Sequence, residues 1–149
     1  MRVAEYLNGE HIAFETLLHA PAYTAQHRAK FLGVSGNHVA KAVLLRGQEG
    51  YLLAVLPATK RIDTAAVSSA LGSPISVASG EEVAVVFRDC EWGVVGPFGK
   101  LYGIPSILDT SIALDEMMIF ESDTHAEAIR IRCSDYASLE RPRRLSFAR

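Results

Sequence analysis

The amino-acid sequence predicts an α+β fold with a mostly antiparallel or mixed sheet. Segments with strand character outnumber segments with helical character, and they cluster along the chain. The helical segments lie between them without the strict strand–helix–strand alternation of a doubly wound fold. A chain of 149 residues with 49% hydrophobic and 21% charged residues is long and apolar enough to build one core. These observations predict a single domain over residues 1–149.

The N-terminal part of the chain begins with short elements. Residues 1–7 are expected to form a helical turn, and residues 11–18 have the character of a strand. Thr24 is expected at the N-cap of the next helix, because a threonine hydroxyl accepts a hydrogen bond from a free amide of the first turn. Gly33 ends this helix, since glycine readily adopts the left-handed conformation that follows a helix.

Residues 39–45 form an apolar strand in which Lys41 is the single ionisable residue. A lysine is seldom buried without a partner, because removing water from an ammonium group costs several kcal/mol. This pattern leaves two explanations open. Either Lys41 extends from the sheet into solvent, or it points into a cleft and binds an anion such as a phosphate.

A hairpin and a capped helix follow. Residues 51–56 are expected to pair with the Lys41 strand through a five-residue loop, Arg46–Gly50. Asp63 has the position of an N-cap, and Gly72 has the position of a C-terminal glycine. The sequence therefore predicts a helix between these two residues.

A short strand and another helix come next. Residues 75–77 have strand character, and Ser79 with Glu82 three residues later matches a capping box. In this motif the serine hydroxyl accepts a hydrogen bond from one backbone amide, and the glutamate carboxylate accepts one from the serine amide. The motif predicts the start of a helix at this point.

Residues 92–99, Trp-Gly-Val-Val-Gly-Pro-Phe-Gly, are the least regular segment. Three glycines and one proline in eight residues exclude a regular element, yet the other side chains are apolar. Glycine lets the backbone turn tightly and lets a ligand approach closely, with amides free to bind it. The composition is compatible both with a partly buried turn and with a ligand-binding loop.

Residues 104–108 are expected to form a strand that ends at a turn. Pro105 lacks an amide hydrogen, which favours an edge strand or a bulge. Asp109 begins the turn, because an aspartate side chain readily accepts hydrogen bonds from nearby amides.

The C-terminal part of the chain is predicted to contain two more strands, residues 117–120 and 128–133. The second alternates apolar and basic side chains, so its apolar side is expected to face the core. Ser134 is expected to cap a last short helix. Residues 141–149 form a basic tail with four arginines and no acid, which either contacts a phosphate backbone or frays in solvent.

The composition excludes several classes of protein. A net charge of −2 argues against binding of DNA or other nucleic acid by bulk charge. No apolar run reaches the roughly 18 residues of a membrane span, and no signal-peptide core is present, so a cytoplasmic location is expected. Cys90 and Cys133 lie far apart and the histidines are scattered, so neither a disulfide framework nor a metal site is expected. Among the histidines, His125 lies between two predicted strands and is a candidate for lining a cleft.

Four motifs occur in an informative order: Thr24-Ala25-Gln26, Gly36-x-x-Val39-Ala40-Lys41, Ala54-Val55-Leu56-Pro57, and Gly93-x-x-x-Pro97-Phe98-Gly99 followed by Asp109. In this order they resemble the YbaK/EbsC family, which includes the editing domain inserted in bacterial prolyl-tRNA synthetases and its free-standing relatives. The resemblance covers about residues 8–140. It implies a mixed, barrel-like sheet flanked by helices, and a reaction without cofactor or metal.

The resemblance also implies an activity and a set of site residues. Members of the family hydrolyse a wrong aminoacyl group from tRNA, typically tRNA(Pro) that carries alanine, cysteine or another small residue. The implied partners are the aminoacylated 3′ end of tRNA and prolyl-tRNA synthetase, and the oligomeric state is left open. By position, Lys41 holds the 3′-terminal nucleotide or its phosphate near the ester. The implied catalytic residues are Lys41, Gly93, Gly96 and Pro97, and the implied substrate-binding residues are Thr24, Phe98, Gly99, Asp109 and His125.

The chemistry of an aminoacyl ester agrees with the motifs that are present. The ester is already activated, so an enzyme needs mainly to position water and to stabilise the oxyanion with fixed amides. The sequence shows no serine-hydrolase elbow, phosphate loop or zinc-protease motif. Two alternatives stay open, a non-catalytic module of the same fold that binds tRNA or a nucleotide, and a hydrolase of other small aminoacyl esters.

Overall fold

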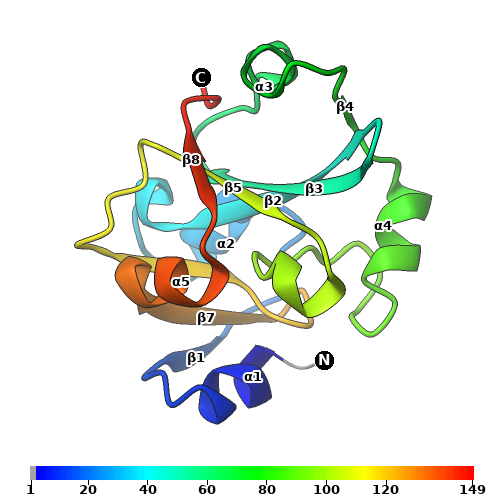
Figure 1. The fold of residues 1–149 in the computed structure, drawn as a ribbon. Coiled ribbons are helices and arrows are strands. Elements are labelled where there is room, and N and C mark those ends of the chain that lie inside the picture. Colours follow the sequence, from blue (N-terminus) through cyan, green and yellow to red (C-terminus); the bar gives the residue numbers. More distant parts are fainter. Residues whose placement is uncertain (1–2) are drawn as a thin grey trace.

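The strands form two sheets in a computed structural model that describes residues 3–149 (Figure 1). One sheet has three strands in the order β1-β7-β6, and the other has five in the order β4-β2-β3-β5-β8. The predicted α+β class and mixed pairing are confirmed, but the sheets do not close into a barrel. Residues 1–2 of the expected N-terminal turn lie outside the described residues, and the helix begins at Val3.

The elements follow one another with short connections. The helical elements are α1 (Val3–Gly9), α2 (Ala25–Leu32), η1 (Gly36–His38), α3 (Thr64–Leu71), α4 (Gly80–Val86), η2 (Gly99–Tyr102) and α5 (Cys133–Glu140). The strands are β1 (Glu15–Leu18), β2 (Ala40–Gly47), β3 (Gly50–Pro57), β4 (Ser76–Val77), β5 (Ser106–Asp109), β6 (Met117–Glu121), β7 (Glu127–Arg132) and β8 (Arg143–Leu145). The strand expected over residues 11–18 is thus confined to its second half.

Three of the four predicted N-caps are confirmed. The side chain of Thr24 accepts a hydrogen bond from the His27 amide, and Asp63 caps α3 in the same way. Ser79 and Glu82 form both hydrogen bonds of the capping box at the start of α4. Each cap depends on residues three positions apart, so the local sequence was sufficient to predict it.

The β2–β3 hairpin is tighter than expected. Its strands pair up to Gly47 and Gly50, so the connection contains two residues, Gln48 and Glu49, and not the five of the predicted loop. Gly50 has a φ of 129°, which a residue with a side chain rarely adopts. Gly50 therefore lets the hairpin extend as far as the residue pair Gly47–Gly50.

Strand β5 is not at an edge, contrary to the expectation from Pro105. It lies between β3 and β8 and runs parallel to both. Pro105 precedes the first strand residue, so its missing amide removes no hydrogen bond from the ladder, and its carbonyl accepts one from the Leu53 amide at 2.9 Å.

The C-terminal end of the chain is more ordered than a frayed tail. Helix α5 begins directly after β7 with Arg132 at its N-cap, so the predicted cap at Ser134 was wrong. Beyond this helix, β8 pairs with β5, and the side chain of Phe147 is buried. The backbone of Arg149 exchanges two hydrogen bonds with that of Arg61.

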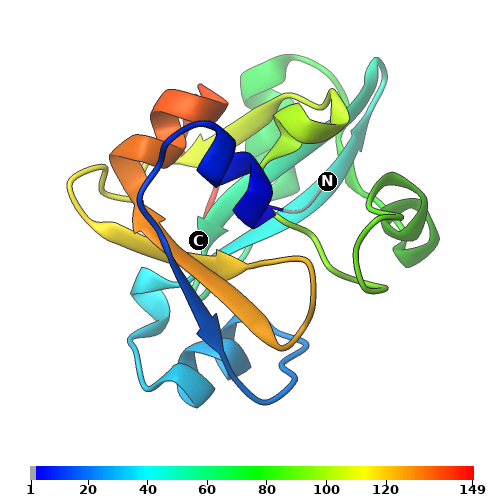
Figure 2. The same ribbon diagram turned by 90° about the horizontal axis from the view of Figure 1, so that it is seen from below.

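The main core lies between the two sheets and beneath α1 and α5. Its large buried side chains come from both sheets, both helices and the loop before η2, and they include Leu7, Phe98, Phe120, Ile129 and Tyr136. Helix α3 covers the other side of the five-stranded sheet, and α4 packs near the hairpin (Figures 1 and 2). Among residues 3–149, no helix has both the length and the apolar character needed to cross a membrane.

Candidate functional site

A cavity of about 510 Å³ lies where the start of α2, the start of β2, the glycine loop of residues 92–99 and the end of β6 meet. A parallel bridge between Val39 and Ile119 joins the two sheets beside this cavity. Lys41 and Glu121 each lie two residues beyond that bridge, so the same contact places both at the cavity. Its lining residues are Tyr23, Thr24, Ala25, Gln26, His27, Arg28, Ala40, Lys41, Ala42, Ala58, Gly93, Val95, Pro97, Phe120 and Glu121.

Lys41 is a partly buried cation without a carboxylate partner among the described residues. Burial lowers its pKa below the ordinary lysine value, and the positive charge of Arg61 lowers it further. Both effects oppose the charged form, and a bound anion would relieve both. The geometry therefore favours the second explanation of the sequence pattern, in which Lys41 faces a cleft suited to an anion.

The glycine loop presents its backbone to the cavity. Gly93 has a φ of 88°, and a Cβ at that position would lie 3.6 Å from Nε2 of His125. The amides of Gly93 and Gly96 donate to no group within the described residues. Pro97 is buried, and its carbonyl accepts a hydrogen bond of 2.8 Å from the Tyr136 hydroxyl. The loop is thus anchored at one end and keeps two amides available.

A buried ion pair forms part of the cavity wall. Nη2 of Arg28 lies 2.7 Å from Oε1 of Glu121, and the Arg28 side chain is 3% exposed. The same Nη2 donates to the carbonyl of Ala22, whereas Nε of Arg28 has no hydrogen-bond partner among residues 3–149. Burial lowers the pKa of Arg28, and Glu121 opposes this shift. The pair fixes the end of β6 against the first turns of α2.

His125 lies behind the cavity and connects its walls. Its Nδ1 is 2.8 Å from Oε1 of Glu121, and its Nε2 is 2.7 Å from the carbonyl of Trp92. Both partners are hydrogen-bond acceptors, so the ring satisfies both when both nitrogens carry hydrogen. The ring also contacts Tyr23, with centroids 4.8 Å apart. His125 does not line the cavity, but it contacts two residues that do, Glu121 and Tyr23.

The structure brings together part of the predicted site. Thr24, Lys41, Gly93 and Pro97 line the cavity. The remaining predicted residues do not line it; they are Gly96, Phe98, Gly99, Asp109 and His125. The residues carried over by motif therefore divide into a group at the cavity and a group that supports the surrounding structure.

Phe98 and Gly99 belong to the structural group. Phe98 is 1% exposed and packs against the rings of Tyr6, Phe120 and Tyr136. A Cβ at Gly99 would lie 2.3 Å from the Ile104 carbonyl oxygen, so the chain is too close for any side chain there.

Asp109 is a buried hydrogen-bond acceptor outside the cavity. One carboxylate oxygen accepts from the amides of Phe147 and Ala148, both at 2.9 Å, and the other accepts from the amide and hydroxyl of Ser111. Burial on its own would raise the pKa of Asp109, but these hydrogen bonds outweigh it and lower the pKa below the ordinary value. The observed contacts attach the C-terminal segment to β5.

We expect Asp109→Ala to destabilise the fold at neutral pH by about 2–3 kcal/mol, because several amides lose a charged acceptor. The folded-state pKa of Asp109 is depressed, so its contribution is present above the unfolded-state pKa and is lost as the pH falls through the folded-state value. Urea unfolding of both proteins at pH 7 and near pH 3 checks this. The difference should shrink at the lower pH, and an equal difference at both pH values would contradict the assignment.

The sequence analysis did not identify several cavity residues. Arg28 and Glu121 are 93 positions apart, and arginine and glutamate side chains are usually solvated. The sequence around each residue therefore did not indicate that the two form an ion pair. Tyr23 falls in the predicted loop before α2, and it lines the cavity although it is 71% exposed. The sequence predicts Phe120 only as part of the apolar strand over residues 117–120.

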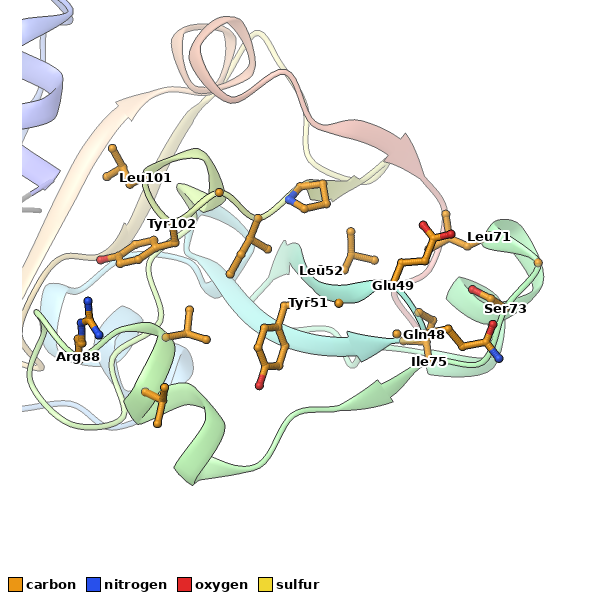
Figure 3. A pocket seen from close by; sticks show the side chains of 18 of the residues that line it. Gln48, Glu49, Tyr51, Leu52, Leu71, Ser73, Ile75, Arg88, Leu101 and Tyr102 are labelled. Atoms are coloured by element: carbon orange, nitrogen blue, oxygen red, sulfur yellow. The ribbon is translucent and has the colours of Figure 1, made fainter.

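A second and larger cavity, of about 1310 Å³, lies between the tip of the β2–β3 hairpin, the ends of α3 and α4, and η2 (Figure 3). Gln48, Glu49 and Ser73 lie around one end, and Arg88 and Tyr102 lie around the other. None of the predicted site residues lines it. Within residues 3–149, no group of three or more His, Cys, Asp or Glu side chains could hold a metal ion at either cavity.

The fold and the Lys41 cavity define a small α+β domain in which a partly buried lysine lies beside a loop whose Gly93 and Gly96 amides have no partner among the described residues. Residues 19–139 match the model of the aminoacyl-tRNA editing domain. This chain belongs to the aminoacyl-tRNA editing domain family, the YbaK type, as the motif resemblance indicated.

Relatives of known sequence or structure agree with this assignment. A proline–tRNA ligase of Desulfitobacterium hafniense (strain DSM 10664 / DCB-2) is 30% identical over 92 residues, which are 61% of this chain and 16% of the ligase. The match thus spans a small part of that relative's length.

Two crystal structures share the fold. One, of a hypothetical protein, has a TM-score of 0.90 and 17% identity and covers 100% of both chains. The other is described as a candidate trans-editing enzyme for prolyl tRNA synthetase, with a TM-score of 0.83, 21% identity and coverage of 99% of this chain and 95% of its own.

Proposed function

We propose that this protein is a trans-acting deacylase that removes a small amino acid, such as alanine or cysteine, from mischarged tRNA(Pro). The observation that carries the proposal is the partly buried Lys41, which has no carboxylate partner within residues 3–149 and shares a cavity with the glycine loop. The family assignment supports aminoacyl-tRNA as the substrate class. The sequence similarity to a proline–tRNA ligase supports tRNA(Pro) as the substrate and prolyl-tRNA synthetase as a partner.

In the proposed mechanism, Lys41 binds the phosphate of the 3′-terminal nucleotide and thereby holds the ester at the loop. Water attacks the ester carbonyl, and the amide of Gly93, which lines the cavity, stabilises the oxyanion that develops. The bond to the ribose oxygen then breaks, which releases the free amino acid and the uncharged tRNA end. Positioning supplies most of the rate, because the ester is already activated.

Selection by size would follow from the apolar part of the cavity. Ala40, Ala42, Val95 and Phe120 line it with side chains that offer no hydrogen bond. One methylene in such a pocket discriminates by about 1–3 kcal/mol. This is enough to separate alanine from the larger, cyclic side chain of proline.

A deacylation screen tests the proposal. Purified protein is incubated with tRNA(Pro) charged with alanine, cysteine, serine, 2-aminobutyrate or proline, and release of the amino acid is followed over time. We expect release of at least one small residue while prolyl-tRNA is spared. Saturable tRNA binding without release from any ester would contradict the proposal and define a binding module. Equal activity on aminoacyl-adenosine without tRNA would define a general hydrolase of small aminoacyl esters.

A further inference from the structure

The Lys41 cavity contains a carboxylate that the proposed mechanism does not use. Glu121 is the one acidic residue among the described residues that line it, and its side chain is 14% exposed. It lies at the end of β6, and the bridge between Val39 and Ile119 keeps it close to the start of β2. The cavity therefore presents both a cation, Lys41, and an anion, Glu121, to the same ligand.

The two oxygens of Glu121 differ in how fully they are occupied. Oε1 is hydrogen-bonded to Nη2 of Arg28 at 2.7 Å and to Nδ1 of His125 at 2.8 Å. Oε2 accepts one hydrogen bond, from the Val95 amide, at 3.3 Å. A carboxylate oxygen has room for about two hydrogen bonds, and 3.3 Å is longer than usual for an amide donor. Oε2 thus keeps an acceptor position that no described residue fills.

The position of Oε2 fits one part of an aminoacyl ester. In the proposed function the ester carbonyl lies at the glycine loop, and the α-ammonium group is bonded to the carbon next to that carbonyl. Glu121 contacts the same loop through Val95, which also lines the cavity. When the ester carbonyl faces the loop amides, the α-ammonium group one carbon away therefore lies on the side of the loop where Oε2 of Glu121 accepts from the Val95 amide.

We infer that Glu121 binds the α-ammonium group of the aminoacyl moiety, so that the site selects esters whose α-amino group is unsubstituted. The inference rests on the proposed function and adds a determinant of the substrate class. Arg28 and His125 hold the carboxylate in place through Oε1, which reduces the cost of ordering it when the substrate binds. A hydrogen bond from an ammonium to a carboxylate is charge-assisted and stronger than one between neutral groups.

The first test compares two esters of the same size with the unmodified protein. One is the aminoacyl-tRNA(Pro) cleaved in the screen, and the other is its α-hydroxy analogue, which for alanine is lactyl-tRNA(Pro). Each rate is divided by the spontaneous rate of that ester, because the ammonium group also activates the ester chemically. We expect the amino ester to be favoured by about 10- to 100-fold in kcat/KM after this correction.

The second test assigns the preference to Glu121. Glu121→Gln should abolish the preference for the amino ester, whereas Glu127→Gln should keep it. Glu127 lies nearby in β7 but does not line the cavity, so it controls for a change in overall charge. If Glu121→Gln leaves Arg28 unpaired and does not fold, the double variant Arg28→Met/Glu121→Gln removes both charges, and the same loss of preference is expected.

The outcomes separate the role of Glu121 from the proposed deacylase function. Equal corrected rates for the two esters would overturn the role of an ammonium-binding group and leave the deacylase function standing. A preference that survives in a folded Glu121 variant would overturn the assignment to this residue. Absence of release from every ester in the screen would overturn the proposed function and, with it, the inference.

Discussion

Replacement of Lys41 by methionine is expected to lower kcat/KM for deacylation by about 10²–10³-fold, the usual loss when a group that stabilises charge in an active site is removed. Methionine has a similar length and no charge, so it removes the anion contact with little change in packing. Initial rates on the best ester of the screen provide the measurement. An activity within twofold of the unmodified protein would contradict the role of Lys41.

The same substitution is expected to have the opposite effect on stability. Burial and Arg61 lower the pKa of Lys41, so its charged form is less favourable in the folded state than in the unfolded state at neutral pH. Removal of the charge should therefore raise Tm, as is common when a residue is kept for function. Thermal unfolding of the two proteins checks this direction.

Lys30→Ala is the matched control for both measurements. Lys30 is exposed in the last turn of α2 and does not line the cavity. Its removal should leave the normalised rate nearly unchanged. Equal losses in the two variants would indicate a general effect of positive charge on tRNA binding instead of a specific contact at Lys41.

Gly99→Ala is expected to destabilise the fold by about 3 kcal/mol or more, near the upper end of the cost of overpacking. The added Cβ would lie 2.3 Å from the Ile104 carbonyl oxygen and 2.9 Å from Oγ of Ser106. Both groups are fixed: the Ile104 amide donates to the Gly99 carbonyl, and the Ser106 hydroxyl is hydrogen-bonded to Glu140. A decrease in Tm of roughly 6–12 °C would correspond to this loss in a domain of this size.

Gly96→Ala in the same loop is the control. The nearest atom to a Cβ there, apart from its chain neighbours, is the Glu121 carbonyl oxygen at 3.9 Å, an ordinary contact. We expect this variant to unfold within about 1 kcal/mol of the unmodified protein, as for a substitution without a clash. If Gly99→Ala proved as stable as Gly96→Ala, the close approach of the chain at Gly99 would be incorrect.

Features that depend on neighbouring residues could be predicted from the sequence. The caps at Thr24, Asp63 and Ser79 each involve an amide within the first turn of the same helix. The alternation in β7 likewise correctly placed Ile129 and Ile131 in the core. These patterns give reliable elements because their physical cause lies within a few positions of the chain.

The motif resemblance went further and identified the family. It could not separate residues that line the cavity from residues that are needed for packing. Gly93 and Gly99 belong to one motif, yet Gly93 lines the cavity and Gly99 makes room for the Ile104 carbonyl. A glycine has no side chain, so the sequence does not show whether a ligand or another part of the chain approaches its backbone.

The sequence by itself determined that the chain is an α+β domain, where most of its helices begin, and which strand carries Lys41. The tertiary structure alone decided that Glu121 and Arg28 complete the cavity, that Asp109 binds the C-terminal segment, and that β8 pairs with β5. The physical reason is the range of the interactions. Caps and periodic strands are set by neighbours in the chain, whereas a buried ion pair between residues 93 positions apart exists only after two sheets and a helix have packed together.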